Sequence, residues 1–122
     1  MNIALWVVQA LLALVYLGAG GMKVARPREQ LVATGRFDWM KDTSDAGVKA
    51  VGAVEVLGAL GLILPELTGI APILTPIAAV GLVVVQVGAI RVHLTRGERQ
   101  PLPANVILLL LAAFVAVGRF LG

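Results

Sequence analysis

Long apolar stretches separated by short polar connections dominate the pattern of this chain. Each stretch is long enough to cross the roughly 30 Å hydrocarbon core of a bilayer as a helix, at about 1.5 Å per residue. We therefore predict an all-α fold, a bundle of four transmembrane helices in one membrane domain of residues 1–122. The predicted spans are residues 3–24, 46–64, 72–93 and 104–120.

The connections between these spans differ in length and in charge. The first, residues 25–45, mixes basic with apolar side chains, and Pro27 and Gly35 suit the two ends of a short helix. We predict a short amphipathic segment there, lying on the membrane surface, with an ordinary polar loop as the alternative. Pro65 is predicted to end the second span, and the short connection of residues 65–71 makes the second and third helices an antiparallel pair.

Composition supports lipid as the solvent for most of the chain. Apolar residues make up 59% and charged residues 14%, whereas soluble proteins have about 45–50% and about 25%. The first apolar run lacks a basic segment before it and is long enough to span, so we interpret it as a retained helix. The absence of cysteine excludes Fe–S clusters and Cys-ligated zinc, and a single histidine argues against a metal site, so we expect none.

The basic residues indicate topology rather than nucleic-acid binding. They are concentrated in the first and third connections and their flanks, and only Arg119 lies at the other side. The positive-inside rule then predicts that both basic loops are cytoplasmic and both termini are outside. The net charge of +3 is accompanied by no basic helix face and no nucleic-acid motif, so we expect no nucleic-acid partner.

One carboxylate lies near the middle of the second predicted span. Gly52, Glu55, Gly58 and Gly61 recur every three residues, which predicts that Glu55 lies on a face of small residues where another helix can come close. An ionisable group at this depth is costly, so it usually has a partner or a task. Glu55 is therefore the first candidate for a functional residue.

Other polar side chains fall into layers when depth is counted along the helices. Tyr16, Glu55 and Gln86 lie at a similar level, roughly 10–14 Å inside the cytoplasmic face. A second layer at that face consists of Lys23, His93 and Asn105, and a third layer near the outer face consists of Gln9 and Arg119. This pattern predicts a polar interior open toward the cytoplasm, in which Tyr16 or Gln86 hydrogen-bonds Glu55.

We interpret this interior as a candidate site. Glu55 would be the catalytic acid or base and His93 its proton relay, because a desolvated carboxyl without a nearby cation can hold a proton near neutral pH. The substrate-binding residues would be Tyr16, Lys23, Gln86 and Asn105. Structural alternatives stay open for four of these residues: Glu55 as a packing contact between helices, His93 as an interfacial residue, Lys23 as a topology signal, and Asn105 as the cap of the last helix.

The chain resembles the DoxX-like family of small four-helix bacterial membrane proteins. The resemblance rests on short motifs: residues 18–23 (GAGGMK), residues 52–62 (GAVEVLGALGL), residues 74–79 (LTPIAA), residues 89–93 (AIRVH) and residues 103–105 (PAN). It implies a multi-pass protein of the bacterial inner membrane. Members of this group resemble small subunits of membrane oxidoreductases, including a thiosulfate–quinone oxidoreductase, and many have no assigned activity.

Three functions remain open at this stage. The first is a quinone-facing or lipophilic-substrate-facing subunit or small enzyme of a membrane redox system, in which a quinone is compatible as cofactor but unassigned. The second is a proton-coupled transporter of lipophilic cations, ranked lower because small multidrug transporters carry their essential glutamate in the first helix. The third is a structural or assembly protein. A homodimer or larger membrane complex fits all three, and whether the chain is an enzyme is left open.

Overall fold

The structure, a computed structural model, describes residues 2–26, 28–33 and 44–121. Every regular element within these ranges is a helix. In these ranges four helices, all except the second, are long and apolar enough to cross a membrane, which confirms the predicted all-α, four-span fold. The helices are α1 (Asn2–Ala25), α2 (Arg28–Ala33), α3 (Asp45–Thr68), α4 (Leu74–Thr95) and α5 (Leu102–Leu121).

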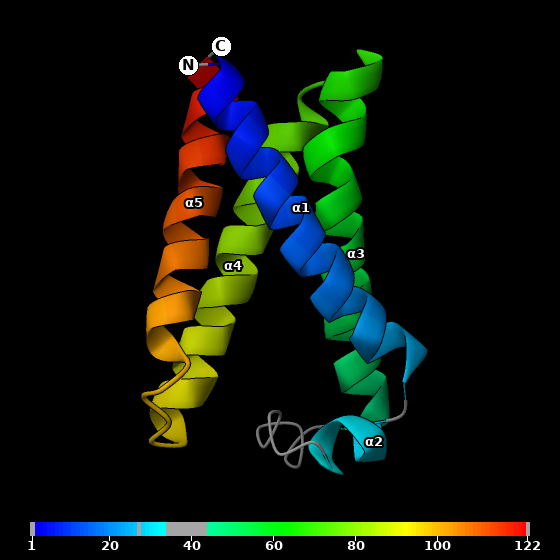
Figure 1. The fold of residues 1–122 in the computed structure, drawn as a ribbon, viewed down its shortest axis with the longest axis vertical. Coiled ribbons are helices and arrows are strands. Elements are labelled where there is room, and N and C mark those ends of the chain that lie inside the picture. The colour runs from blue at the N-terminus through cyan, green and yellow to red at the C-terminus, as the bar shows by residue number, and fades with distance from the viewer. Residues whose placement is uncertain (1, 27, 34–43, 122) are drawn as a thin grey trace.

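The short helix α2 falls within the predicted amphipathic segment between the first two spans. Its Leu31 is buried and packs with the buried Val48 of α3 and with Met22 of α1. One side of α2 is therefore held against the ends of both long helices, as Figure 1 shows. The predicted helix start at Pro27 and end at Gly35 lie outside the described residues.

Helix α3 begins one residue before the predicted span and ends later than predicted. At its start, the Ser44 hydroxyl oxygen accepts a hydrogen bond from the Gly47 amide at 3.0 Å, as an N-cap does. The predicted end at Pro65 is wrong, because α3 continues to Thr68. It closes on Gly69, whose φ of 72° lies in the left-handed region that favours glycine.

A tertiary hydrogen bond makes Pro65 acceptable inside α3. Proline has no N–H, so the Gly61 carbonyl one turn earlier loses its helical donor. The buried hydroxyl of Thr75, in the first turn of α4, donates to that carbonyl at 2.9 Å. This bond both satisfies the orphaned carbonyl and holds α3 and α4 together beside their connection.

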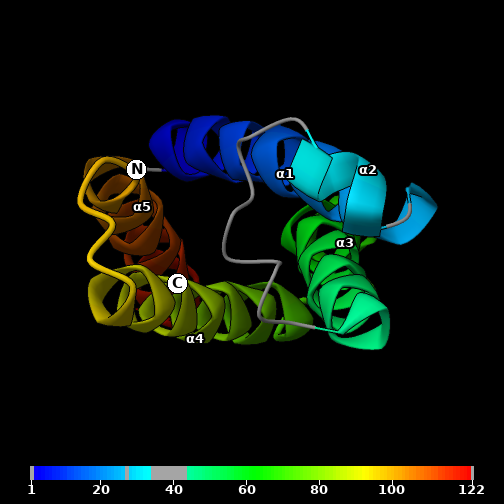
Figure 2. The same cartoon turned by 90° about the horizontal axis from the view of Figure 1, so that it is seen from below.

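The long helices α1, α3, α4 and α5 form a closed ring in which each packs on two neighbours, as Figure 2 shows. The buried core lies in the half of the bundle that holds both chain ends and the α3–α4 connection, which we call the closed end. Toward the opposite end, which we call the open end, α1 and α3 diverge from α4 and α5. The core consists of Leu12, Tyr16, Ala59, Leu62, Ala79, Leu82, Ala112, Val115 and Ala116.

The outward side of the ring is apolar. Leu14 and Leu57, for example, expose 70% and 68% of their surface. Buried polar side chains occur instead within the bundle: Gln9, Lys23, Glu55, Thr75 and Gln86. This distribution is the one that a hydrocarbon solvent requires, so the surroundings of α1, α3, α4 and α5 are a lipid bilayer.

Two glycines set the distance between α1 and α3. A Cβ atom built on Gly20 would lie 2.6 Å from the Gly52 carbonyl oxygen and 2.9 Å from the Glu55 Cβ. A Cβ on Gly52 would lie 2.6 Å from the Lys23 Cβ and 2.8 Å from the Gly20 carbonyl oxygen. The two backbones therefore touch at this crossing, and any side chain at either position would force them apart.

The glycine series of α3 faces two neighbours rather than one. Gly52 meets α1, whereas a Cβ on Gly58 or Gly61 would lie 2.7 Å from Leu82 or Ala78 of α4. A spacing of three residues falls short of the 3.6-residue helical turn, so successive members rotate around the helix axis. The small residues therefore do not lie on one face, as predicted, but wind around α3 and allow close contact with both α1 and α4.

Gly20→Ala should destabilise the bundle by about 1–3 kcal/mol, because the added methyl group would meet a backbone oxygen that cannot move alone. The adjacent Gly21 provides a matched control, since a Cβ there has no atom within 4 Å. Thermal unfolding of both variants in the same detergent measures the difference. Equal unfolding temperatures for Gly20→Ala and Gly21→Ala would contradict the close crossing.

Candidate functional site

A cavity of about 1180 Å³ occupies the open half of the bundle. Its walls come from α1, α3, α4, α5 and the α4–α5 connection, and most of its lining side chains are apolar. Every candidate site residue that the sequence indicated lines this cavity: Tyr16, Lys23, Glu55, Gln86, His93 and Asn105. The structure therefore brings the predicted polar interior together, while the catalytic and binding roles of these residues stay predictions.

Glu55 forms a buried ion pair with Lys23. The Lys23 ammonium donates to Glu55 Oε1 at 2.6 Å, and the two side chains expose only 9% and 6% of their surface. The prediction that Tyr16 or Gln86 hydrogen-bonds Glu55 is wrong. The α1–α3 crossing places Gly20 of α1 against Gly52, so the lysine one turn further along reaches inward to the carboxylate.

The pairing gives Glu55 a partner. A buried carboxylate without a partner is costly, and the Lys23 ammonium at 2.6 Å provides that partner. The sequence analysis considered Glu55 without a nearby cation, whereas the structure places the Lys23 ammonium in contact with it.

Tyr16 and Gln86 bond to each other across the cavity. The Gln86 side-chain amide donates to the Tyr16 hydroxyl at 2.6 Å, linking α1 to α4. Gln86 is 4% exposed, and its Oε1 has no hydrogen-bond partner among the described residues. If the amide were flipped, its nitrogen would be unpartnered instead, so one polar atom of Gln86 is free in either orientation.

Asn105 contributes a second unpartnered polar atom. It lies inside the first turn of α5, where its backbone N–H donates to the Pro101 carbonyl at 3.2 Å. The alternative that Asn105 caps this helix is wrong, because α5 begins three residues earlier at Leu102. Its buried Nδ2 has no partner among the described residues, and the side chain lines the cavity.

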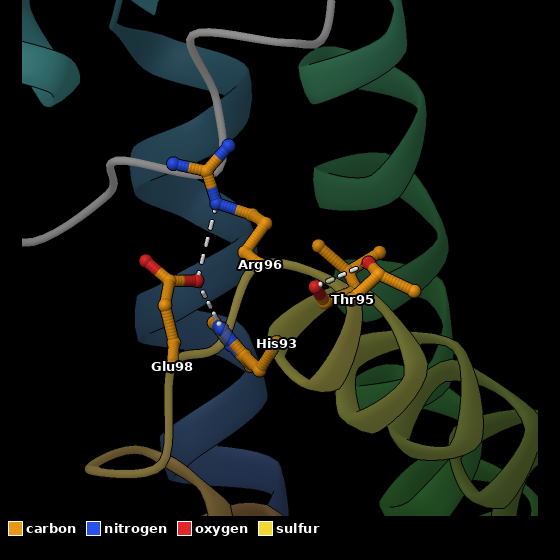
Figure 3. A network of polar contacts seen from close by, with 5 residues as sticks. His93, Thr95, Arg96 and Glu98 are labelled. Carbon is orange, nitrogen blue, oxygen red and sulfur yellow. Dashed lines mark hydrogen bonds and ion pairs between the residues drawn. The ribbon is translucent and has the colours of Figure 1, made fainter.

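An acidic residue that the sequence analysis did not single out binds His93. Glu98 Oε1 lies 2.9 Å from His93 Nδ1 and 3.2 Å from Arg96 Nε, and Figure 3 shows the carboxylate between the two. Gly97, with φ 71°, turns the chain back after α4, so the Glu98 amide donates to the His93 carbonyl at 2.8 Å. A glycine just after a helical pattern was the available signal for this return.

Thr95 does not belong to this group. Its hydroxyl donates to the Val92 carbonyl at 2.8 Å, and Figure 3 shows it on the other side of the helix end. The cavity thus has a polar inner part, formed by the Lys23–Glu55 and Tyr16–Gln86 pairs, and a polar mouth formed by His93 and Glu98.

The closed end carries a separate polar cluster. Arg119 Nε donates to Gln9 Oε1 at 2.7 Å, and Gln9 Nε2 donates to the Leu62 carbonyl at 2.5 Å. Arg119 Nη1 also donates to Asn2 Oδ1 at 2.9 Å, and the guanidinium lies 5.4 Å from the ring centre of Trp6. The predicted layer of Gln9 and Arg119 is confirmed, and its contacts tie α1, α3 and α5 together.

The polar groups of the cavity are few and lie among apolar walls. Across the part of the chain that the structure describes, no three His, Cys, Asp or Glu side chains gather in a group that could hold a metal. The cavity instead combines apolar walls with a few inward polar groups, including the free atoms of Gln86 and Asn105. Small-molecule sites have this composition.

Comparison with known proteins identifies a family. The sequence model described as the DoxX-like family matches residues 7–115. No curated protein and no solved structure matches the chain.

Removing both members of the Lys23–Glu55 pair should cost less stability than the two single substitutions predict together. Glu55→Gln leaves a buried ammonium without its counter-charge, and Lys23→Met leaves a buried carboxylate, whereas the double variant leaves neither. A double-mutant cycle of unfolding free energies should give a coupling of about 0.5–3 kcal/mol. Additive effects would show that the two side chains do not interact.

Proposed function

Because the chain belongs to the DoxX-like family of integral membrane proteins, we propose that it binds a lipophilic small molecule in the open-end cavity and serves a membrane redox system. It would act as a small subunit or a small enzyme there, with a quinone or a molecule of similar chemistry as ligand. Family membership supports the link to a membrane redox system, and the apolar walls and few polar groups of the cavity support a lipophilic ligand.

The observation that carries the proposal is the pair of unpartnered polar atoms at the cavity. Leaving a buried polar atom without a partner costs about 1–3 kcal/mol, so Gln86 and Asn105 together favour a bound molecule. The Asn105 amide can donate to a ligand oxygen, and Gln86 has one atom free for a ligand donor or acceptor. A ring bearing carbonyl or hydroxyl groups would satisfy both, and the apolar walls would cover its faces.

The Lys23–Glu55 pair would supply the acid–base chemistry. A quinone bound in the cavity would supply two-electron redox chemistry coupled to proton exchange. In this proposal Glu55 exchanges a proton with the ligand, and the Lys23 ammonium, 2.6 Å from its Oε1, holds the carboxylate in place at the cavity. His93, bonded to Glu98 at the mouth, would pass protons between the cavity and the aqueous side.

Charge at the open end supports an orientation. The described residues Lys23, Lys49, Arg91, Arg96 and Arg99 lie in or beside this end of the bundle, and Arg119 lies at the closed end. By the positive-inside rule the cavity would open to the cytoplasm of a bacterial inner membrane, with both termini outside. Electrons would then reach the ligand from a redox protein in a larger membrane complex, to which a homodimer of this chain could also belong.

The structure bears differently on the two alternative functions, cation transport and a structural role. Transport of lipophilic cations is disfavoured, because the Lys23 ammonium already occupies the position beside Glu55 that a cationic substrate would need. A structural role for the pair is favoured by its place at the α1–α3 crossing, where it joins the two helices. The structural role does not require a ligand, so binding experiments distinguish it from the proposed function.

Asn105→Leu should weaken binding of a tail-less ubiquinone analogue by up to about tenfold, the equivalent of about one neutral hydrogen bond. The protein should remain folded, because Asn105 Nδ2 has no partner in the described chain to lose. Dissociation constants in nanodiscs provide the measurement, with the exposed neighbour Val106→Ala as the matched control. Equal affinity of Asn105→Leu and wild type would argue against this contact.

Infrared difference spectroscopy should detect Glu55 when the ligand binds. Adding the tail-less ubiquinone analogue to the protein should change a carboxyl or carboxylate band that Glu55→Gln removes, because a polar ring bound beside the Lys23–Glu55 pair alters the hydrogen bonds of the pair. Glu66→Gln, on the same helix but away from the cavity lining, should retain the band. A Glu55 band that does not respond to the ligand would support a purely structural pair.

A further inference from the structure

The seam between α3 and α4 is tightly packed only toward the closed end. There a Cβ on Gly58 would lie 2.7 Å from Leu82 Cδ2, and a Cβ on Gly61 would lie 2.7 Å from Ala78 Cβ. The Thr75–Gly61 hydrogen bond belongs to the same region. From Gly58 toward the open end, by contrast, residues on both helices line the cavity.

Some of these lining residues lie on the outer rim of the seam. Val54 of α3 and Val84 of α4 line the cavity and yet expose 49% and 64% of their surface. Val84 and Gly88 are four residues apart and so share one face of α4, and Gly88 is also an exposed lining residue. We interpret this exposed edge of the cavity between α3 and α4 as a side opening, in addition to its polar mouth.

A shallow apolar groove of about 210 Å³ continues from this opening along the outside of the seam. It shares Val54 with the cavity, so the two spaces adjoin at that residue. No charged side chain lines it. The groove is formed by Val54, Leu57, Gly58, Ala78, Gly81 and Leu82.

Two glycines keep this route free of side chains without being needed for packing. A Cβ atom on Gly81 or on Gly88 would have no atom within 4 Å, and the two are seven residues apart on the same face of α4. They differ in this respect from Gly58 and Gly61, whose missing side chains allow α3 and α4 to touch. Helix packing therefore does not require glycine at these two positions, whereas a free path for a ligand along this face does.

We propose that the cavity takes a two-part lipid, a polar ring with a long apolar tail, which enters from the bilayer between α3 and α4. The ring contacts Gln86 and Asn105 in the cavity, and the tail leaves past Val54 and Gly88 to lie in the groove. This inference rests on the proposed function and adds to it a long apolar tail on the ligand, with the route and the resting place of that tail. The apolar groove and the buried, unpartnered Gln86 atom mark the two ends of the same ligand.

The test compares two probes on one set of variants in nanodiscs: a long-tailed ubiquinone and its tail-less analogue. Gly88→Phe fills the side opening and should weaken binding of the long-tailed probe by at least about tenfold, with at most about a twofold effect on the tail-less probe. Gly81→Phe, in the groove, should weaken only the long-tailed probe, by a smaller factor. Gly18→Phe is the matched control, since Gly18 is exposed, has no atom within 4 Å of a Cβ, and lies outside the cavity lining.

The outcomes separate this inference from the proposed function. If Gly88→Phe binds the long-tailed probe as wild type does, the entry route is overturned while binding in the cavity stands. Equal weakening of both probes would also overturn the route, because the substitution would then act on the ring. If the wild-type protein binds neither probe, the proposed function and this inference fall together.

Discussion

The contact between α1 and α3 at Gly20 and Gly52 is the constraint on which the rest of the bundle depends. Because the backbones touch there, Lys23 and Glu55 meet in a buried ion pair. That pair neutralises the one carboxylate in the middle of the described spans and lines the cavity. The close contact of α1 with α3 thus also brings together the two charged side chains that neutralise each other.

The closed half of the bundle contains the packed core, and the open half contains the cavity. In the closed half, apolar core residues, the Thr75–Gly61 bond and the Gln9–Arg119 cluster hold the helices together. In the open half, the same helices separate enough to enclose a cavity with polar groups on every wall. Buried polar atoms without a partner among the described residues occur in both halves: Gln86 Oε1 and Asn105 Nδ2 at the cavity, and Arg119 Nη2 at the closed end.

The sequence predicts the spans from hydrophobic length, the family from short motifs, and six polar cavity residues from depth along a helix, but not Glu98 at the mouth. Partner choice within the cavity is not predictable in this way. It depends on the rotation of α1 against α3, so Lys23 rather than Tyr16 reaches Glu55. The extension of α3 past Pro65 depends likewise on a hydroxyl from α4, and local proline chemistry alone predicts a helix end.

The ion pair also bears on how the chain enters the membrane. A charged residue at the centre of a span adds about 2.5–3.5 kcal/mol to the cost of insertion, so α3 alone is a poorer membrane segment than its apolar residues suggest. Its counter-charge lies in α1, which leaves the ribosome earlier. Lys23 is therefore synthesised before Glu55. When α3 enters the membrane, it can pack against α1 and pair its carboxylate with the Lys23 ammonium.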